Sequence, residues 1–328
     1  MKILLVSPAF HGYWHAIANA LTELGHDVTT HRYDAPNLRG RITNAVAQRV
    51  QGVMARRAAE SASELAVAAL RRSAPDAVLI VKGDALTATW WDALTRSRAR
   101  SAVWLYDELE RMHYDVETLG SLGAVMSYSP SDVSTLRNRG ISASHLPDGF
   151  DSLTAYTSRP SSRVSFIGAR YPERERLLQM LSASGEDVEA YGREWSRHIW
   201  DVLRTRRWEG SGVRAHRDVT RADYYGVMAG SVATLNVHGA GHDGLSMRTF
   251  EAPGVGGLQL IDRPEVAAHY DVGSETLVFT SDDELLDHLA RVRRDPKWAE
   301  GVRTAGRART LAEHTLVHRM RKAVALWG

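Results

Sequence analysis

The chain contains no cysteine among its 328 residues. A disulfide framework and a zinc site built on thiolates are therefore excluded, and a reducing cytoplasm is the compartment that this composition suits. No segment approaches the roughly 20 consecutive apolar residues that a membrane-spanning helix needs. The formal net charge is only +2, so no overall electrostatic field indicates nucleic acid as a partner.

Two further patterns are missing. The opening stretch, MKILLVSPAF, has one lysine and a short apolar run, so we interpret it as a first β-strand and not as a signal peptide. The turn that follows, Pro8–Gly12, lacks the G-x-G-x-x-G spacing of a dinucleotide-binding fingerprint. The sequence also shows no internal repeat.

What is present predicts an α/β protein with two domains. The chain is too long for one typical domain, and its hydrophobic residues, 44% of the total, are enough for two cores. Apolar runs alternate with helical patterns in both halves, which predicts parallel sheets with right-handed crossovers. Thr154–Ser162 is rich in serine, threonine and proline and is interpreted as a linker. The predicted divisions are residues 1–153, residues 154–310 and a terminal helical segment, residues 311–328.

The individual elements follow from the apolar patterns. The expected strands are Lys2–Ser7, His26–Arg32, Asp76–Lys82, Ser101–Asp107, Gly123–Ser129, Arg163–Ala169, Asp187–Gly192, Val213–His216, Ser231–Val237, Leu258–Asp262 and Thr276–Ser281. The main expected helices are Thr43–Arg72, Leu86–Arg96, one capped by Ser131 and Asp132, one from Pro172, Glu194–Arg204, Ala222–Met228, Asp282–Arg294 and Lys297–Leu326.

Residues 238–257, HGAGHDGLSMRTFEAPGVGG, lie between two apolar runs and predict a glycine-rich loop and a short helix. A loop at the carboxyl end of a strand is where α/β sheets bind ligands. We expect the helix to begin near Ser246, so that free N–H groups of its first turn favour a phosphate. Arg248 is a cation in that first turn, which pairing with phosphate would explain. Glu251 can accept hydrogen bonds from two neighbouring hydroxyls, as on a ribose.

The spacing Asp243-x7-Glu251 resembles the E-x7-E signature of retaining GT-B glycosyltransferases, with aspartate in the first position. The string D-G-L-S-M-R-T-F-E-A, followed by G-G, is more similar to the CgeB-like, spore-maturation type. The resemblance implies two Rossmann-like domains facing a cleft, with a C-terminal helix that crosses back to the first domain. It implies that Glu251 holds the ribose, that Asp243 lies near the donor sugar, and that the nucleotide site includes Ser246, Met247 and Thr249. The alternative is an acidic helix cap with a surface ion pair.

The run FIGARYPER, residues 166–174, resembles the G-R-x-x-x-K element in which both basic groups touch the donor diphosphate. Gly168 leads the run, Arg170 is displaced by one position, and Arg174 stands where lysine is usual. Arginine keeps the charge but changes the geometry. Together with Arg248, these arginines are expected to stabilise charge on the leaving diphosphate without a metal. The alternative is that Arg170 and Arg174 pair with neighbouring glutamates on a surface helix.

Three other loops are candidate parts of the site. Tyr191 and Gly192 end a strand where stacking and backbone contacts can hold a nucleobase. His11 and Gly12 lie in the first loop of the N-terminal domain, which in this family approaches the diphosphate or the acceptor. Asp107 ends a strand and is our first choice of general base for an inverting enzyme. The resemblance favours retention, in which the departing phosphate can take the acceptor proton.

A UDP- or GDP-sugar is the expected donor, and the acceptor is not identified by the sequence. No metal is expected, because the Asp-x-Asp signature of the other glycosyltransferase fold is absent and His238, His242 and Asp243 offer no third anchored ligand. A GT-B sugar-nucleotide epimerase is one alternative function. A non-catalytic protein that binds nucleotide sugars is the other.

Two further patterns have structural interpretations. Between Leu38 and Ala59 every charged residue is an arginine, which indicates a solvated helix face, or else a weak contact with an anionic membrane surface or an acidic acceptor. These residues are Arg39, Arg41, Arg49, Arg56 and Arg57. His314, Thr315 and Arg319 match an H-T-x-x-x-R string near the end of CgeB-like chains, where packing of the terminal helix is the expected role.

Overall fold

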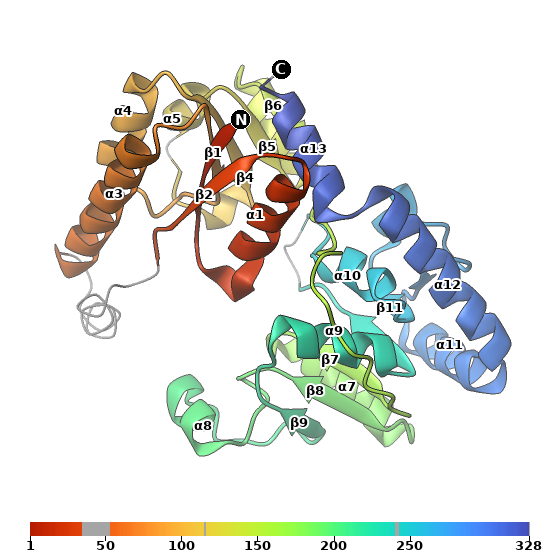
Figure 1. Cartoon of the computed structure of the whole chain (residues 1–328). Helices are drawn as coiled ribbons and strands as arrows, with labels where there is room; N and C mark the ends of the chain where they lie inside the picture. The colour runs from red at the N-terminus through yellow and green to blue at the C-terminus, as the bar shows by residue number, and fades with distance from the viewer. Residues whose placement is uncertain (35–52, 115, 240–242, 328) are drawn as a thin grey trace. The chain divides into compact units, whose positions relative to one another are not determined.

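The computed structural model describes residues 1–34, 53–114, 116–239 and 243–327, which form two compact units (Figure 1). Unit 1 comprises Met1–Asp148 and Leu316–Gly328, and unit 2 comprises Gly149–Thr315. Each unit contains a six-stranded sheet in which all paired strands are parallel. The predicted α/β class with two Rossmann-like domains is confirmed.

The sheet of unit 1 has the strand order β2-β1-β3-β4-β5-β6. Its strands are β1 (Lys2–Ser7), β2 (Asp27–Arg32), β3 (Ala77–Val81), β4 (Arg100–Leu105), β5 (Val125–Ser127) and β6 (Ala143–His145). Its helices are α1 (Tyr13–Glu23), α3 (Val53–Ser73), α4 (Ala88–Arg96), α5 (Val116–Gly120), α6 (Pro130–Asn138) and α13 (Leu316–Ala325).

Both faces of this sheet are covered, because alternate residues of each strand point to opposite sides. Leu4 and Val6 of β1 pack with α3 and α4 in one core, which also contains Trp90. Ile3 and Leu5 pack with α1 and α13 in the other. The adjacent tryptophans at positions 90 and 91 are both buried, as a structural role predicts.

The sheet of unit 2 has the strand order β12-β11-β10-β7-β8-β9. Its strands are β7 (Val164–Ile167), β8 (Val188–Tyr191), β9 (Arg214–His216), β10 (Ala233–Asn236), β11 (Gln259–Ile261) and β12 (Leu277–Val278). Its helices are α7 (Pro172–Ala183), α8 (Ile199–Thr205), α9 (Arg221–Gly230), α10 (Arg248–Gly254), α11 (Asp282–Arg294) and α12 (Pro296–Glu313). One core lies under α7, α11 and α12, and the other lies under α9 and α10.

The predicted terminal helix, Lys297–Leu326, is wrong as a single element. The structure divides it into α12 in unit 2 and α13 in unit 1, with His314 and Thr315 between them. The break is stabilised by backbone contacts, because the Phe150 N–H donates to the His314 carbonyl at 2.9 Å and Thr315 forms a β-bridge with Phe150. Arg319 then donates from Nε to the carbonyls of Pro147 and Asp148, each at 2.9 Å.

Three other predicted helices need smaller corrections. The cap of α6 is Ser129, whose side chain accepts from the backbone N–H of Asp132, and Ser131 plays no such part. The helix predicted at Glu194–Arg204 begins only at Ile199. The helix predicted to begin near Ser246 begins at Arg248.

The arginine-rich stretch lies mostly outside the described residues, since Arg39, Arg41 and Arg49 fall in 35–52. Arg56 and Arg57 are exposed near the beginning of α3. In the part of the chain that the structure describes, no helix is both long enough and apolar enough to cross a membrane.

Candidate functional site

The loops that follow β7 and β10 meet at the carboxyl edge of the sheet in unit 2, because these two strands are neighbours. Gly168 directly follows β7, and Arg174 lies in the first turn of α7. Arg248 begins α10, which the loop after β10 leads into. Ligands bind at this edge of open parallel sheets, notably where successive crossovers leave in opposite directions.

Arg174 and Arg248 are held close together at this edge. Arg174 is buried and donates from Nε to the Val237 carbonyl at 2.9 Å and from Nη1 to the Ala169 carbonyl at 3.2 Å. The Arg248 guanidinium lies against Gly168, where a Cβ would be 3.2 Å from Nη1 of Arg248. Burial, followed by the charge of Arg248, lowers the pKa of Arg174 to about 10. Arg174 thus remains a cation at neutral pH, beside a second one.

Neither of these arginines forms a salt bridge with a carboxylate in residues 1–34, 53–114, 116–239 and 243–327. Among the described residues, their hydrogen bonds go to neutral acceptors, and Arg248 has a single long contact, 3.4 Å, from Nε to Oδ1 of Asn236. Two neighbouring cations without a carboxylate partner form a site that an anion can complete.

Gly168 and Gly192 allow the loops after β7 and β8 to approach each other. Gly168 donates its N–H to the Tyr191 carbonyl at 3.1 Å and accepts from Nε1 of Trp195 at 2.8 Å. Gly192 has φ +145°, and a Cβ there would lie 2.8 Å from the Gly168 carbonyl oxygen. A side chain at Gly192 would therefore separate the two loops.

Arg170 is placed differently from Arg174. Its guanidinium donates to both carboxylate oxygens of Glu175, at 2.9 and 2.5 Å, and to the Glu209 carbonyl at 3.0 Å. The alternative interpretation, in which the arginine pairs with a neighbouring glutamate, thus describes Arg170, whose side chain is buried in an ion pair. It does not describe Arg174, and only Arg174 joins Arg248 at Gly168.

His238 orients the loop before α10. Its Nδ1 lies 3.0 Å from Oδ1 of Asp262, and its Nε2 accepts from the backbone N–H of Ser246 at 3.1 Å. Because Nε2 is an acceptor, the ring proton is on Nδ1 and the ring is neutral. Burial lowers the pKa of His238 against the opposing effect of Asp262, which agrees with a neutral ring. The N–H of Ser246 is therefore already bonded, which corrects the expectation that it faces a phosphate.

This geometry predicts a pH-dependent contribution to stability. The pKa of His238 in the folded state is below its ordinary value of 6.5, so the unfolded state binds more protons as the pH falls through that value. The free energy of unfolding should decrease below pH 6.5, by up to about 1.4 kcal/mol per pH unit from this group. His238→Gln should show a smaller decrease in urea unfolding between about pH 7.5 and about pH 5.5. An identical pH dependence in both proteins would exclude this role.

Asn236 links β10 to the loop and to α10. Its Oδ1 accepts from Oγ of Ser246 at 3.2 Å, and its Nδ2 donates to Oγ1 of Thr249 at 3.0 Å and to Oε1 of Gln259 at 3.1 Å. Thr249 is buried and its hydroxyl is engaged within this network. Met247 is half-buried at the position before α10. These contacts fix the backbone that carries Arg248.

Glu251 is fully buried, with a side chain that is 0% exposed. Its oxygens accept from the hydroxyl of Tyr224 at 2.6 Å and that of Tyr225 at 3.2 Å, and Arg221 lies at 3.5 Å. Arg221 also lies 3.9 Å from Asp151. The partners on α9 were not predicted from the sequence. A ribose can reach Glu251 only if the tyrosine or arginine contacts rearrange.

The remaining predicted residues of unit 2 are less enclosed. Asp243 is exposed, and His242 lies outside the described residues. The ring of Tyr191 stacks on His216 at 4.5 Å between centroids and 16° between planes, so one face of the ring is covered. Burial and then Glu189 raise the pKa of Tyr191 to about 12, which keeps its hydroxyl protonated. No group of three or more potential metal ligands occurs among the residues that the structure describes.

In unit 1, His11 and Gly12 lie between β1 and α1. His11 is exposed and has φ 43°, and Gly12 has φ 77° at the N-cap of α1. Asp107 lies two residues after β4 and pairs with Lys82 at 3.1 Å. Burial acts to raise the pKa of Asp107, but the hydrogen bond and charge of Lys82 outweigh it and lower the pKa. A carboxylate held ionised in this way is a poor general base.

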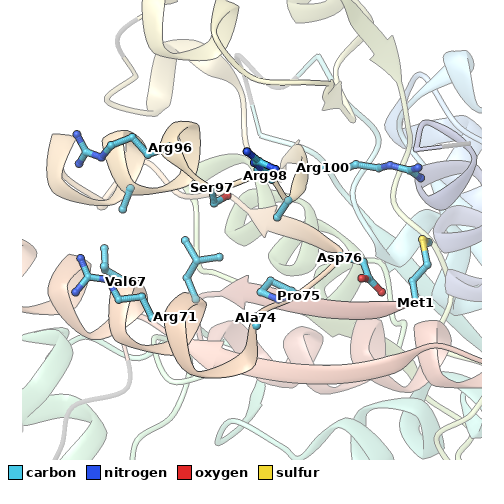
Figure 2. A pocket seen from close by; sticks show the side chains of 13 residues that line it. Met1, Val67, Arg71, Ala74, Pro75, Asp76, Arg96, Ser97, Arg98 and Arg100 are labelled. Atoms are coloured by element: carbon cyan, nitrogen blue, oxygen red, sulfur yellow. The ribbon is translucent and has the colours of Figure 1, made fainter.

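A cavity of about 880 Å³ lies elsewhere in unit 1, at the amino ends of β1, β3 and β4. Figure 2 shows Arg71 and Arg96, from α3 and α4, at one end, and Arg100 near Met1 at the other. Parallel sheets bind ligands at their carboxyl ends. We therefore do not assign the donor site to this cavity, despite its arginines.

Residues 170–325 match the family model described as glycosyl transferase-like. The match includes Arg174, Arg248 and Glu251, and begins two residues after Gly168. No curated protein matches the chain in sequence.

The whole chain is similar to solved structures that share little of its sequence. HepE of Anabaena, in complex with UDP and glucose, has a TM-score of 0.67 at 13% identity, over 99% of this chain and 98% of that one. Sucrose-phosphate synthase of Thermosynechococcus elongatus has a TM-score of 0.64 at 14% identity, over 99% and 98%. A protein of Listeria monocytogenes described as a UDP-N-acetylglucosamine 2-epimerase has a TM-score of 0.61 at 10% identity, over 99% and 95%. These similarities establish a GT-B fold for this chain.

Proposed function

We propose that this protein is a glycosyltransferase that moves a sugar from a nucleotide-sugar donor to an acceptor, with the donor held by unit 2. The Arg174–Arg248 pair carries this proposal. Two like charges in a partly buried position are unfavourable together unless an anion compensates them. The diphosphate of a nucleotide sugar suits two guanidinium groups, because each can donate two parallel hydrogen bonds.

The same pair supplies the chemistry that glycosyl transfer needs. As the bond from sugar to phosphate breaks, negative charge accumulates on the leaving diphosphate, and fixed cations stabilise it. We propose transfer with retention, of the CgeB-like type, since the diphosphate itself can take the acceptor proton. Asp107, in its ion pair with Lys82, is then not required as a base. A UDP- or GDP-sugar is the proposed donor, and the UDP-glucose complex of the structurally similar HepE supports a nucleotide-sugar donor.

Two assignments rest on the sequence motif together with position. Glu251, in α10, remains the proposed ribose ligand. Binding of the ribose would displace the contact of Glu251 with Tyr224 or with Arg221. Asp243 remains the proposed neighbour of the donor sugar, and it is exposed to a ligand. Tyr191, the last residue of β8, and Gly192, directly after it, are the proposed border of the nucleobase site.

A sugar-nucleotide epimerase is the second candidate, because one of the structurally similar proteins is described as such. Such an enzyme would use the same anion site but would need acid and base groups acting on the sugar. In the described part of unit 2, His238 is the histidine nearest to Arg248 in the hydrogen-bond network, and it is neutral with both ring nitrogens engaged. This arrangement favours transfer.

The test combines ligand binding with turnover. UDP-, GDP-, TDP- and CDP-sugars are added one at a time, and the donor should raise the melting midpoint because it binds only the folded protein. Free nucleotide should then be released only when a cell extract supplies acceptor. Both results should persist in excess chelator, because the arginines replace a metal at the diphosphate.

Different outcomes identify the alternatives. Interconversion of the donor sugar without an acceptor would identify an epimerase. Binding without turnover in any extract would indicate a non-catalytic binding protein. Loss of activity in chelator, restored by manganese or magnesium, would show that the metal-free mechanism is wrong.

A further inference from the structure

An exposed apolar surface surrounds α8 in unit 2. Ile199, Trp200 and Leu203 are 56%, 69% and 49% exposed, and Trp208 shortly after the helix is 67% exposed. The three helical residues share one face, because positions three and four apart are neighbours on a helix. Single exposed apolar residues need no explanation, whereas a cluster with two tryptophans does. We call these four residues the α8 patch.

The helix is fixed with its polar side inward. Asp201 is buried and accepts from Nε of Arg217 at 2.8 Å, and its carbonyl accepts from Oγ1 of Thr205 at 2.8 Å. A surface helix ordinarily buries its apolar face and exposes its charges. Here the acidic residue points inward and the tryptophan points outward. The exposure of the α8 patch is therefore a consequence of how the helix is held.

Four arginines surround the α8 patch. Arg197, Arg204, Arg206 and Arg207 are all exposed. Asp201 is the only carboxylate in residues 197–208, and it is neutralised by Arg217. Glu194 lies 4.0 Å from Arg207, and the exposed Glu209 follows Trp208, so the four arginines outnumber these two acidic side chains. Exposed tryptophans beside unpaired or weakly paired arginines are the chemistry that binds an anionic lipid surface.

We propose that the α8 patch docks this protein onto an anionic phospholipid membrane. The tryptophan and aliphatic side chains enter the headgroup region, and the arginines contact lipid phosphates. Figure 1 shows α8 at the margin of unit 2, beyond β8 and β9 and away from α11 and α12, so within that unit it is free to meet a flat surface. The docking is peripheral and reversible, because a seven-residue helix buries little apolar area.

The experiment is sedimentation of the full chain with lipid vesicles. Vesicles of phosphatidylcholine with phosphatidylglycerol are compared with vesicles of phosphatidylcholine alone. The bound fraction should be at least tenfold greater on the anionic vesicles and should decrease with added salt, since screening weakens contacts between exposed charges. Equal binding to both vesicle types, or no binding to either, would overturn the proposal.

Matched variants identify the surface. Trp200→Ser with Trp208→Ser should abolish binding, and Arg204→Ser with Arg206→Ser should reduce it at least tenfold. Val272→Ser with Leu311→Ser is the control, because these residues are also exposed and apolar in unit 2, at 48% and 39%. Loss of binding in the control would refute a specific role for α8.

If the tryptophan variant fails to fold, the variant Arg204→Ser with Arg206→Ser still tests the proposal. Nucleotide-dependent thermal stability should be unchanged in all variants that fold. Sedimentation equilibrium distinguishes the competing explanation. If the wild type self-associates and Trp200→Ser with Trp208→Ser is monomeric, a second copy of the chain covers the α8 patch and the membrane proposal is wrong.

Discussion

Arg248→Ala should lower kcat by about 10²–10³-fold, the usual cost of removing a preorganised group that stabilises developing charge. Donor KM should change much less. The reason is that Arg248 gains interaction energy as charge accumulates on the diphosphate, and only such a gain lowers the barrier. Within the part of the chain that the structure describes, Arg248 donates one long hydrogen bond, 3.4 Å to Asn236, so we expect the variant to fold.

Conservative and control substitutions sharpen this prediction. Arg248→Lys should recover only part of the rate, because an ammonium group cannot donate the two parallel hydrogen bonds of a planar guanidinium group. Arg174→Ala should also lower kcat, although it removes two hydrogen bonds to backbone carbonyls and should reduce stability as well. Arg294→Ala, at an exposed arginine of α11, is the matched control and should have wild-type kinetics. Normal kcat with raised donor KM in Arg248→Ala would assign this residue to uniform substrate binding.

Glu251→Ala should reduce the free energy of unfolding by about 3 kcal/mol, because it removes one member of a buried ion pair. The hydroxyls of Tyr224 and Tyr225 lose their hydrogen bonds to the Glu251 carboxylate, and Arg221 loses its contact with that carboxylate at 3.5 Å. Urea unfolding measures this loss. Glu300→Ala is the control, because that glutamate is 71% exposed in the same unit and its removal should have little effect.

The same variant tests whether Glu251 contacts the ribose. Isothermal titration under conditions where the variant is folded should show nucleotide binding weaker by about 1–3 kcal/mol, the cost of lost charged hydrogen bonds. Tyr224→Phe separates the two roles, because it removes one structural hydrogen bond and leaves the carboxylate. Lower stability with unchanged nucleotide affinity in Glu251→Ala would restrict the residue to a structural role.

The fold could be predicted because its determinants are local. Every described strand except β6 (Ala143–His145) overlaps a strand expected from the sequence, and α11 has the bounds that its apolar period predicts. The break between α12 and α13 could not be predicted in this way. His314 and Thr315 are neither glycine nor proline, and the break depends on backbone contacts with Phe150, far away in the sequence.

The site was only partly predictable for the same reason. Arg170 and Arg174 occur in one short segment beside glutamates, and the sequence does not show that Glu175 engages the first and leaves the second. The burial of Glu251 could not be predicted, because its partner Arg221 lies 30 residues earlier in the sequence, on α9. A cluster of Arg221, Tyr224 and Tyr225 at helical spacing was the available signal, because it places three hydrogen-bond donors on one side of a helix.

The assignment of α13 to unit 1 has a consequence for synthesis on the ribosome. Leu316, Met320 and Trp327 belong to the core that also contains Ile17 of α1. Residues 149–315 emerge earlier, so every strand of unit 2 is available before the core under α1 can close. Domains generally fold during synthesis from the N-terminus onwards. In this chain unit 1 cannot complete its core before unit 2 has been synthesised. The nascent N-terminal part keeps an apolar surface uncovered until residues 316–327 have been translated.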